Sequence, residues 1–171
     1  MKGMGMTDEL LDIVNERDEV IGQMMRSEVY RQNLKNFRAV NAFLQNDAGQ
    51  LWIPRRTEHK RIFPLSLDAS MGGHVGAGET YEQALWRELE EELRIAPHSM
   101  QYKELGLLTP HEHGVSAFAK IYLFQMNEAP EYNPDDYIES FWLTPQELLE
   151  RIASGDPSKS DLPKIIRYFF G

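Results

Sequence analysis

The sequence predicts a single mixed α/β domain, a sandwich in which helices cover both faces of a mixed β-sheet. The chain has 171 residues, about the length of one domain with one core. Short β-type segments are interleaved with a few helical ones, which is the pattern of a sheet covered by helices. No repeat or low-complexity tract divides the chain. We therefore expect one domain over residues 1–171.

The expected strands are short apolar runs bounded by turn residues. Asp47 and Gly49 suit a tight turn between two of these runs. Strands are expected at Leu10–Val14, Val20–Met25, Phe37–Leu44, Leu51–Pro54, Tyr102–Leu108, Val115–Met126 and Ile138–Leu143, with a further extended segment at Leu65–Val75.

One helix is predicted more clearly than the others, from Tyr81 to about Arg94. Thr80 and Gln83 form a capping-box pattern at its start. Apolar side chains then repeat every four residues, at Leu85, Leu89 and Leu93, and build one stripe that would face a core. The remaining helices are expected at Ser27–Leu34 with Ser27 as N-cap, at Pro145–Ala153, and at Asp161–Phe170.

Composition excludes several classes of protein. The formal charge of −9 argues against a partner such as duplex nucleic acid, which requires a basic surface. No apolar run is long enough to span a membrane, and Met1–Glu9 lacks the apolar region of a leader. The chain contains no cysteine, which fits a reducing cytoplasm. An anionic ligand would need a local basic cluster or a divalent metal, and no protein partner is inferred.

Three glutamates of the clearest helix share one face. Glu88, Glu91 and Glu92 stand at i, i+3 and i+4, so their charges repel one another. A divalent cation removes this repulsion, and oxygen ligands suit Mg²⁺ or Mn²⁺. Glu90 points elsewhere and is expected to be an exposed ion-pair partner of Arg94. The alternative for any such run is a solvated helix face.

The surroundings of these glutamates resemble the Nudix box. The matching text is GGHVGAGETYEQALWRELEEELRI, with the matches at Gly73, Glu79, Arg87, Glu88, Leu89, Glu91, Glu92 and Ile95. The resemblance implies a Nudix-type α/β/α sandwich. One position departs from the box, because the glycine near its end is Arg94 here. Since that glycine ends the helix where a positive φ is convenient, we expect a longer or differently ended helix.

The resemblance also implies roles for individual residues. Glu88, Glu91 and Glu92 would hold the catalytic metals, together with the backbone carbonyl of Gly72. Arg87 would orient these carboxylates with Glu79 as its partner. The metals would neutralise phosphate and activate a water molecule. Glu88 is our choice for the group that orients or deprotonates this water.

Much of the remaining chain resembles a Nudix subgroup similar to isopentenyl-diphosphate isomerase. The similar segments are DEVIGQMMRSEVYRQNLKNFRAV, LWIPRR, HKRIFP and DDYIESFWLTPQEL. An isomerase is therefore one alternative function. However, the catalytic cysteine of those isomerases falls at Gly72, and two histidines of their metal site fall at Tyr30 and Phe37. His74 is retained, and alone it is interpreted as a hydrogen-bonded residue. A nucleotide-binding module without turnover is a second alternative.

A basic stretch precedes the box. Arg55, Arg56, Lys60 and Arg61 place four cations within seven residues, either as a solvated loop or as a clamp for the substrate's diphosphate. Arg56 matches an arginine common in the subgroup. Glu112, outside the box, is a candidate for an extra base or metal ligand, although a polar loop is the favoured interpretation of this segment. We expect hydrolysis of nucleoside 5′-di- and triphosphates, small nucleotide substrates, with Mg²⁺ as cofactor.

Overall fold

The computed structural model describes residues 8–171, so most of the stretch Met1–Glu9 lies outside the described part. A six-stranded sheet forms the centre of the fold. Its order is β6–β7–β3–β4–β8, and β5 pairs with β3 beyond this path. The strands are β3 (Arg38–Gln45), β4 (Leu51–Arg56), β5 (Met71–His74), β6 (Tyr102–Leu108), β7 (Phe118–Gln125) and β8 (Tyr137–Leu143). β3 and β7 run parallel and the other pairs antiparallel, which confirms the mixed sheet.

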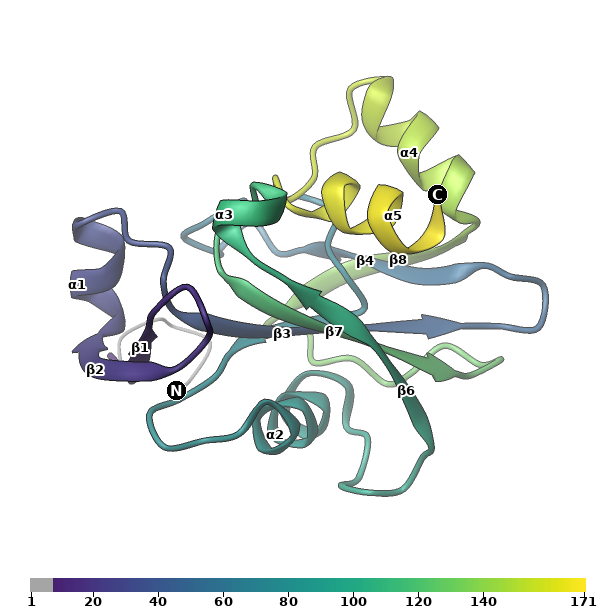
Figure 1. Cartoon of the computed structure of the whole chain (residues 1–171). Coiled ribbons are helices and arrows are strands. Elements are labelled where there is room, and N and C mark those ends of the chain that lie inside the picture. Colours follow the sequence, from purple (N-terminus) through teal and green to yellow (C-terminus); the bar gives the residue numbers. More distant parts are fainter. Residues whose placement is uncertain (1–7) are drawn as a thin grey trace.

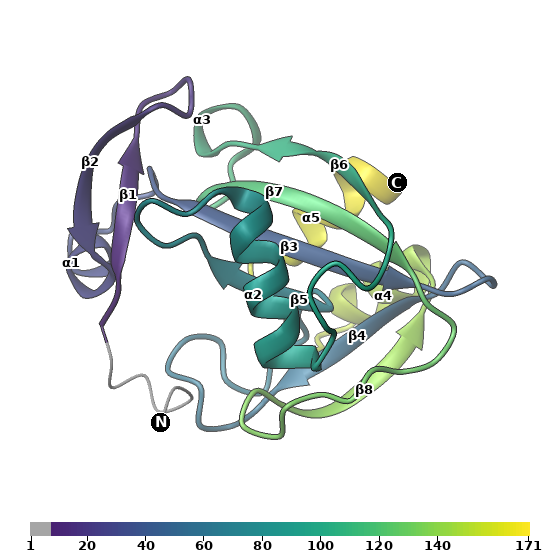
Figure 2. The ribbon, with the colours of Figure 1, turned by 90° about the horizontal axis from the view of Figure 1, so that it is seen from below.

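Helices cover both faces of this sheet (Figure 1). α2 (Tyr81–Leu93) crosses one face beneath β3 and β5, as Figure 2 shows, and α4 (Pro145–Ala153) and α5 (Leu162–Phe170) cover the other. Alternation along β3 serves both layers, because Val40 and Leu44 contact the α2 side while Phe43 contacts the α5 side. The expected sandwich, a mixed sheet with helices on both faces, is confirmed.

A separate β-hairpin stands at one end of the sheet. It consists of β1 (Leu10–Val14) and β2 (Val20–Met25), and α1 (Arg26–Arg31) follows it directly. The expectation that Ser27 caps this helix is wrong, because the N-cap is Met25 and carries no side-chain cap. The Ser27 hydroxyl instead donates to the carboxylate of Asp8.

Two other elements differ from expectation. Of the extended segment 65–75, only its last part forms the strand β5. The loop after β6 contains a single helical turn, α3 (Pro110–His113), which Thr109 caps by accepting a bond from the Glu112 N–H.

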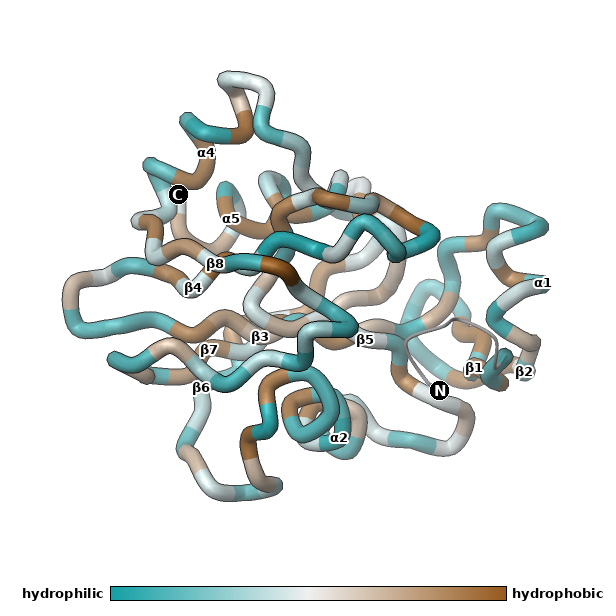
Figure 3. The backbone as a smooth tube through the Cα atoms, turned by 180° about the vertical axis from the view of Figure 1, so that it is seen from behind, coloured by the Kyte–Doolittle hydropathy of each residue, from teal (hydrophilic) through white to brown (hydrophobic). Residues whose placement is uncertain are grey.

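Hydrophobic and hydrophilic segments alternate along α2 (Figure 3). Within residues 8–171, no helix is long and apolar enough to cross a membrane.

β4 and β5 both pair with β3 but not with each other, which leaves an opening in the sheet between them. β3 pairs with β4 only where Gln45 meets Leu51, whereas β5 pairs with the first half of β3. The chain at 66–68 follows β4 instead, with the Asp68 N–H donating to the carbonyl of Pro54 at 3.0 Å. Residues from α2, β5, β4 and β8 therefore meet around this opening.

Candidate functional site

The helix α2 is anchored by its apolar stripe. Leu85, Leu89 and Leu93 are buried, as predicted, and pack in the core against the sheet. The predicted capping box is confirmed, with the Thr80 hydroxyl accepting from the Gln83 N–H. Because the helix start and the apolar face are both fixed, the remaining faces of α2 have defined directions.

The end of α2 corrects one expectation. The helix stops at Leu93, and Arg94 takes the left-handed conformation, with φ 57° and ψ 31°. Its N–H still donates to the carbonyl of Glu90. An arginine thus adopts the geometry that glycine adopts easily, and the helix is neither longer nor differently ended. The expected ion pair with Glu90 is also wrong, since the Arg94 guanidinium lies 3.6 Å from Glu131.

Glu88 lies beneath strand β5. It is only 7% exposed, and its side chain packs against Gly73. A Cβ added at Gly73 would lie 2.5 Å from the Glu88 Cδ, closer than real Cβ contacts allow. Glycine at this position therefore makes room for a carboxylate against the backbone.

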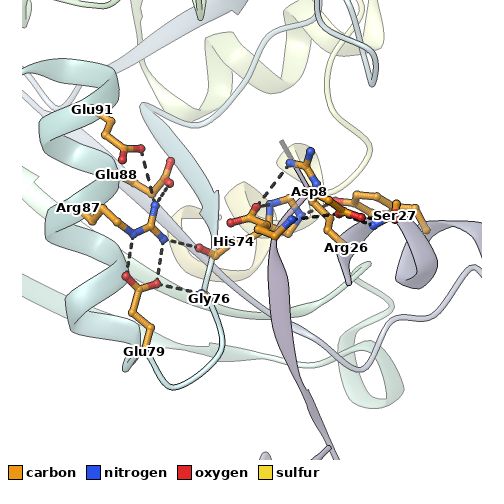
Figure 4. Close-up of polar contacts among 11 residues, drawn as sticks. Asp8, Arg26, Ser27, His74, Gly76, Glu79, Arg87, Glu88 and Glu91 are labelled. Carbon is orange, nitrogen blue, oxygen red and sulfur yellow. Dashed lines mark hydrogen bonds and ion pairs between the residues drawn. The ribbon is translucent and has the colours of Figure 1, made fainter. Parts of the chain in front are cut away.

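Arg87 is held between three glutamates and the chain (Figure 4). Its Nε and one terminal nitrogen donate to the two oxygens of Glu79, at 2.7 and 2.9 Å, and the latter nitrogen also donates to the His74 carbonyl at 3.0 Å. The other terminal nitrogen contacts Glu88 and lies 3.7 Å from Glu91. Glu79 also accepts from the Gly76 N–H at 2.9 Å. Arg87 therefore links the loop before α2 to the carboxylates on it.

Glu92 lies next to Glu88 and reaches toward β8. The Tyr137 hydroxyl donates to its Oε1 at 2.9 Å. Burial raises the pKa of the Glu92 carboxyl well above its ordinary value, and the neighbouring charges of Glu88 and Asp136 raise it further. Two buried carboxylates in contact are destabilised when both are ionised, so this pair favours a proton or a cation.

The oxygen donors of this helix could hold a divalent metal. Carboxylates and backbone carbonyls are the groups that Mg²⁺ and Mn²⁺ prefer, and the mutual repulsion of Glu88 and Glu92 is what such an ion would remove. Across residues 8–171, no three carboxylate or histidine groups already converge in a metal-binding arrangement. Arg87 lies between Glu88 and Glu91, so ligation by all three glutamates requires side-chain rotation.

The four predicted cations do not form one cluster. Successive strand residues point to opposite faces, and Arg55 and Arg56 have different partners accordingly. Arg55 pairs with Asp156 at 2.8 Å and with Glu139 at 2.5 Å.

Arg56 donates to the buried Asp68 at 3.0 Å, and Lys60 pairs with Asp136 at 2.7 Å. Arg61 is exposed on the following loop.

Glu112 has its partners within its own helical turn. Its carboxylate accepts from the Thr109 hydroxyl at 3.4 Å and lies 3.7 Å from His111. Its helix, α3, lies on the face of the sheet opposite to α2 (Figure 1). The structure thus does not place Glu112 against the glutamates of α2.

Three rings meet where the isomerase resemblance had placed histidines. The ring centroids of Tyr30, Phe37 and His74 lie 5.6–5.9 Å apart, and the Tyr30 hydroxyl bonds the His74 Nε2 at 2.5 Å. His74 is therefore a hydrogen-bonded residue, as interpreted from the sequence. Burial is the main reason that its pKa falls to about 3, with smaller contributions from the charges of Arg26, Lys159 and Arg87.

Sequence reasoning missed Tyr137, Asp68 and Lys159. Tyr137 and Lys159 come from segments far from the box, Asp68 lies just before it, and no spacing in the sequence linked any of them to it. Buried Asp68 interrupts an apolar stretch, which was the one available signal.

Comparison with known proteins places the chain in a family. The NUDIX domain profile matches residues 35–162. A Nudix hydrolase of Nostoc sp. is 57% identical over 95% of this chain and 96% of its own length. A Nudix hydrolase of Deinococcus radiodurans is 45% identical over 95% of each chain. The crystal structure of DR0079 from D. radiodurans covers 95% of this chain and 100% of its own, with 44% identity and a TM-score of 0.90.

The chain belongs to the Nudix family, whose hydrolases generally use divalent metal ions. It is a Nudix hydrolase.

Proposed function

We propose that this Nudix hydrolase cleaves the phosphoanhydride bond of nucleoside 5′-di- and triphosphates by attack of water at phosphorus, with Mg²⁺ as cofactor. The products are the monophosphate and either phosphate or pyrophosphate. One observation carries the proposal. Glu88 is buried and Glu92 is partly buried, and their carboxylates are in contact at the opening of the sheet, with Arg87 bound to Glu88 beside them.

The ion would be held by Glu88, Glu91 and Glu92 and by the Gly72 carbonyl. When bound, it supplies positive charge to the substrate phosphates and lowers the pKa of a coordinated water. Glu88 orients or deprotonates the attacking water. Arg87 is fixed by Glu79, and its positive charge balances part of the negative charge of the carboxylates.

The cations on the β4 side are proposed to meet the substrate phosphates. Arg56 is the main candidate, with Lys60 and Arg61 on the loop that follows. Arg55 is assigned to stability instead, because both ends of its guanidinium are occupied by Asp156 and Glu139.

The isomerase alternative receives no supporting observation. The resemblance to the isomerase-like subgroup stays a prediction, and it assigns the metal histidines to Tyr30 and Phe37. Those side chains form an aromatic cluster with His74, and none of the three residues supplies a carboxylate or thiolate. Gly72 carries no thiol to protonate an alkene.

A panel of nucleotides with Mg²⁺ tests the proposal, with products followed by phosphorus NMR in ¹⁸O-water. We expect ¹⁸O in the monophosphate or in the released phosphate or pyrophosphate, according to the phosphorus attacked, and no turnover without a divalent ion. If no nucleotide in a broad panel is hydrolysed, the proposed substrate class is wrong. Formation of dimethylallyl diphosphate from isopentenyl diphosphate would establish the isomerase instead.

Thermal unfolding tests the metal site separately. A ligand that binds only the native state stabilises it by RT ln(1 + [L]/Kd), about 1.4 kcal/mol at tenfold excess over Kd. Millimolar Mg²⁺ should raise the Tm, and Glu92→Gln should reduce the rise. A metal-dependent rise without turnover on any nucleotide would favour a binding module.

A further inference from the structure

Lys159 is a cation outside the box whose position the backbone fixes. Its N–H donates to the Leu67 carbonyl at 3.0 Å, and the Leu67 N–H donates to the Pro157 carbonyl at 2.8 Å. Ser158 and Leu67 form a parallel bridge between these two bonds. An isolated β-bridge thereby attaches the segment before α5 to the chain that leads into β5.

Lys159 and Arg56 share one buried carboxylate. Asp68 is 3% exposed and accepts from the Ala69 N–H at 2.7 Å and from Arg56 at 3.0 Å. The Lys159 Nζ lies 3.9 Å from the same carboxylate, within ion-pair range and beyond hydrogen-bond range. Within this group, two positive charges face one negative charge.

The Lys159 ammonium lies beside Gly72. A Cβ added at Gly72 would be 4.0 Å from its Nζ, whereas a Cβ added at Gly73 would meet Glu88. Successive residues of a strand face opposite sides, so Lys159 and Glu88 flank β5 from its two sides. Because a residue's carbonyl oxygen lies within about 3.5 Å of its Cβ position, the ammonium is within about 7.5 Å of the Gly72 carbonyl.

The ammonium has unused donors. Among residues 8–171, the Lys159 Nζ makes no hydrogen bond, and its side chain is 32% exposed. An ammonium carries three N–H donors, and a fixed, partly exposed one suits phosphate oxygens as a point charge. A structural counter-ion of Asp68 would instead be expected to bond it directly, as Arg56 does.

We propose that Lys159, together with Arg56, forms a subsite that binds the non-bridging oxygens of the substrate's diphosphate across β5 from Glu88. The identity of the substrate as a nucleotide rests on the function proposed above. The subsite itself requires only a diphosphate. Asp68 is a positioning residue, since it acts by holding the two cations.

Lys159→Met removes the charge and keeps the length of the side chain. The matched control is Lys103→Met, at an exposed residue of β6, which is the edge strand opposite β8. We expect Lys159→Met to raise KM for nucleoside diphosphates about tenfold, the loss of one charge-assisted hydrogen bond, with kcat changed much less. Lys159→Arg should recover most of the affinity, and Lys103→Met should leave KM unchanged.

Binding without turnover gives a second measurement. Methylenediphosphonate, a diphosphate that cannot be hydrolysed at its bridge, should raise the Tm of the wild type and of Lys103→Met in the presence of Mg²⁺. The rise should be smaller for Lys159→Met. This result would support the subsite even if no nucleotide were hydrolysed, in which case only the proposed substrate would fail.

Two outcomes would overturn the subsite. One is a lowered Tm for Lys159→Met with unchanged KM and unchanged response to methylenediphosphonate, which would make Lys159 a counter-ion of Asp68. The other is a wild-type protein that methylenediphosphonate does not stabilise at any concentration tested.

Discussion

Replacing Arg94 by glycine should stabilise the protein. Arg94 ends α2 with φ 57°, a conformation that costs a non-glycine residue about 1–2 kcal/mol. Glycine adopts it without that cost but loses about 0.5–1 kcal/mol through the greater freedom of the unfolded chain. The Arg94–Glu131 pair, with side chains 56% and 82% exposed at 3.6 Å, contributes little.

The expected net gain for Arg94→Gly is therefore about 0.5–1 kcal/mol, which for a chain of this size raises the Tm by about 1–4 °C. The bond from the residue's N–H to the Glu90 carbonyl is retained, because it involves only the backbone. Hydrolysis should be unaffected, since the helix already ends where the glycine would end it.

Urea unfolding at constant m-value measures this difference, with Arg94→Ala as the matched control. Alanine removes the ion pair and keeps the strained backbone, so its stability should equal or fall slightly below that of the wild type. If Arg94→Gly were no more stable than Arg94→Ala, the reasoning from the left-handed conformation would be refuted.

Three further predictions concern the site and its support. Glu88→Gln should lower kcat at least ~10²-fold, because it removes a charge needed in the transition state. In the same steady-state assay, Glu90→Gln, at an exposed residue, should leave kcat within about twofold of the wild type. Gly73→Ala should lower kcat comparably, since its Cβ would lie 2.5 Å from the Glu88 Cδ; activity near wild type would contradict this packing. The pKa of Asp156 is lowered mainly by its bonds to Arg55, and this side chain should contribute about 1–3 kcal/mol to the free energy of unfolding at pH 7. Because a lowered folded-state pKa stabilises only the ionised form, the deficit of Asp156→Asn in urea unfolding should shrink as pH falls below the ordinary value of 3.8, and a constant deficit would count against it.

The sequence by itself determined the elements and the local geometry of the carboxylate helix. The spacing of Glu88, Glu91 and Glu92 assigns them to one face, and the leucine stripe assigns another face to the core, because both follow from the helical period alone. The capping box located the helix start because it is a local pattern of hydrogen bonds between Thr80 and Gln83. The left-handed Arg94 was not predicted, since propensity disfavours it and only the packing of the following chain requires it.

Only the tertiary structure decided which distant groups join the helix. Tyr137 reaches Glu92, and Lys159 reaches Gly72, across long stretches of sequence with no common period. Arg55 and Arg56 are neighbours in the chain, yet strand pairing gives one to Asp156 and the other to Asp68. These contacts depend on strand register, on the opening of the sheet between β4 and β5, and on which face the core occupies. Such quantities are set by the packing of the whole chain, so no local pattern of residues encodes them.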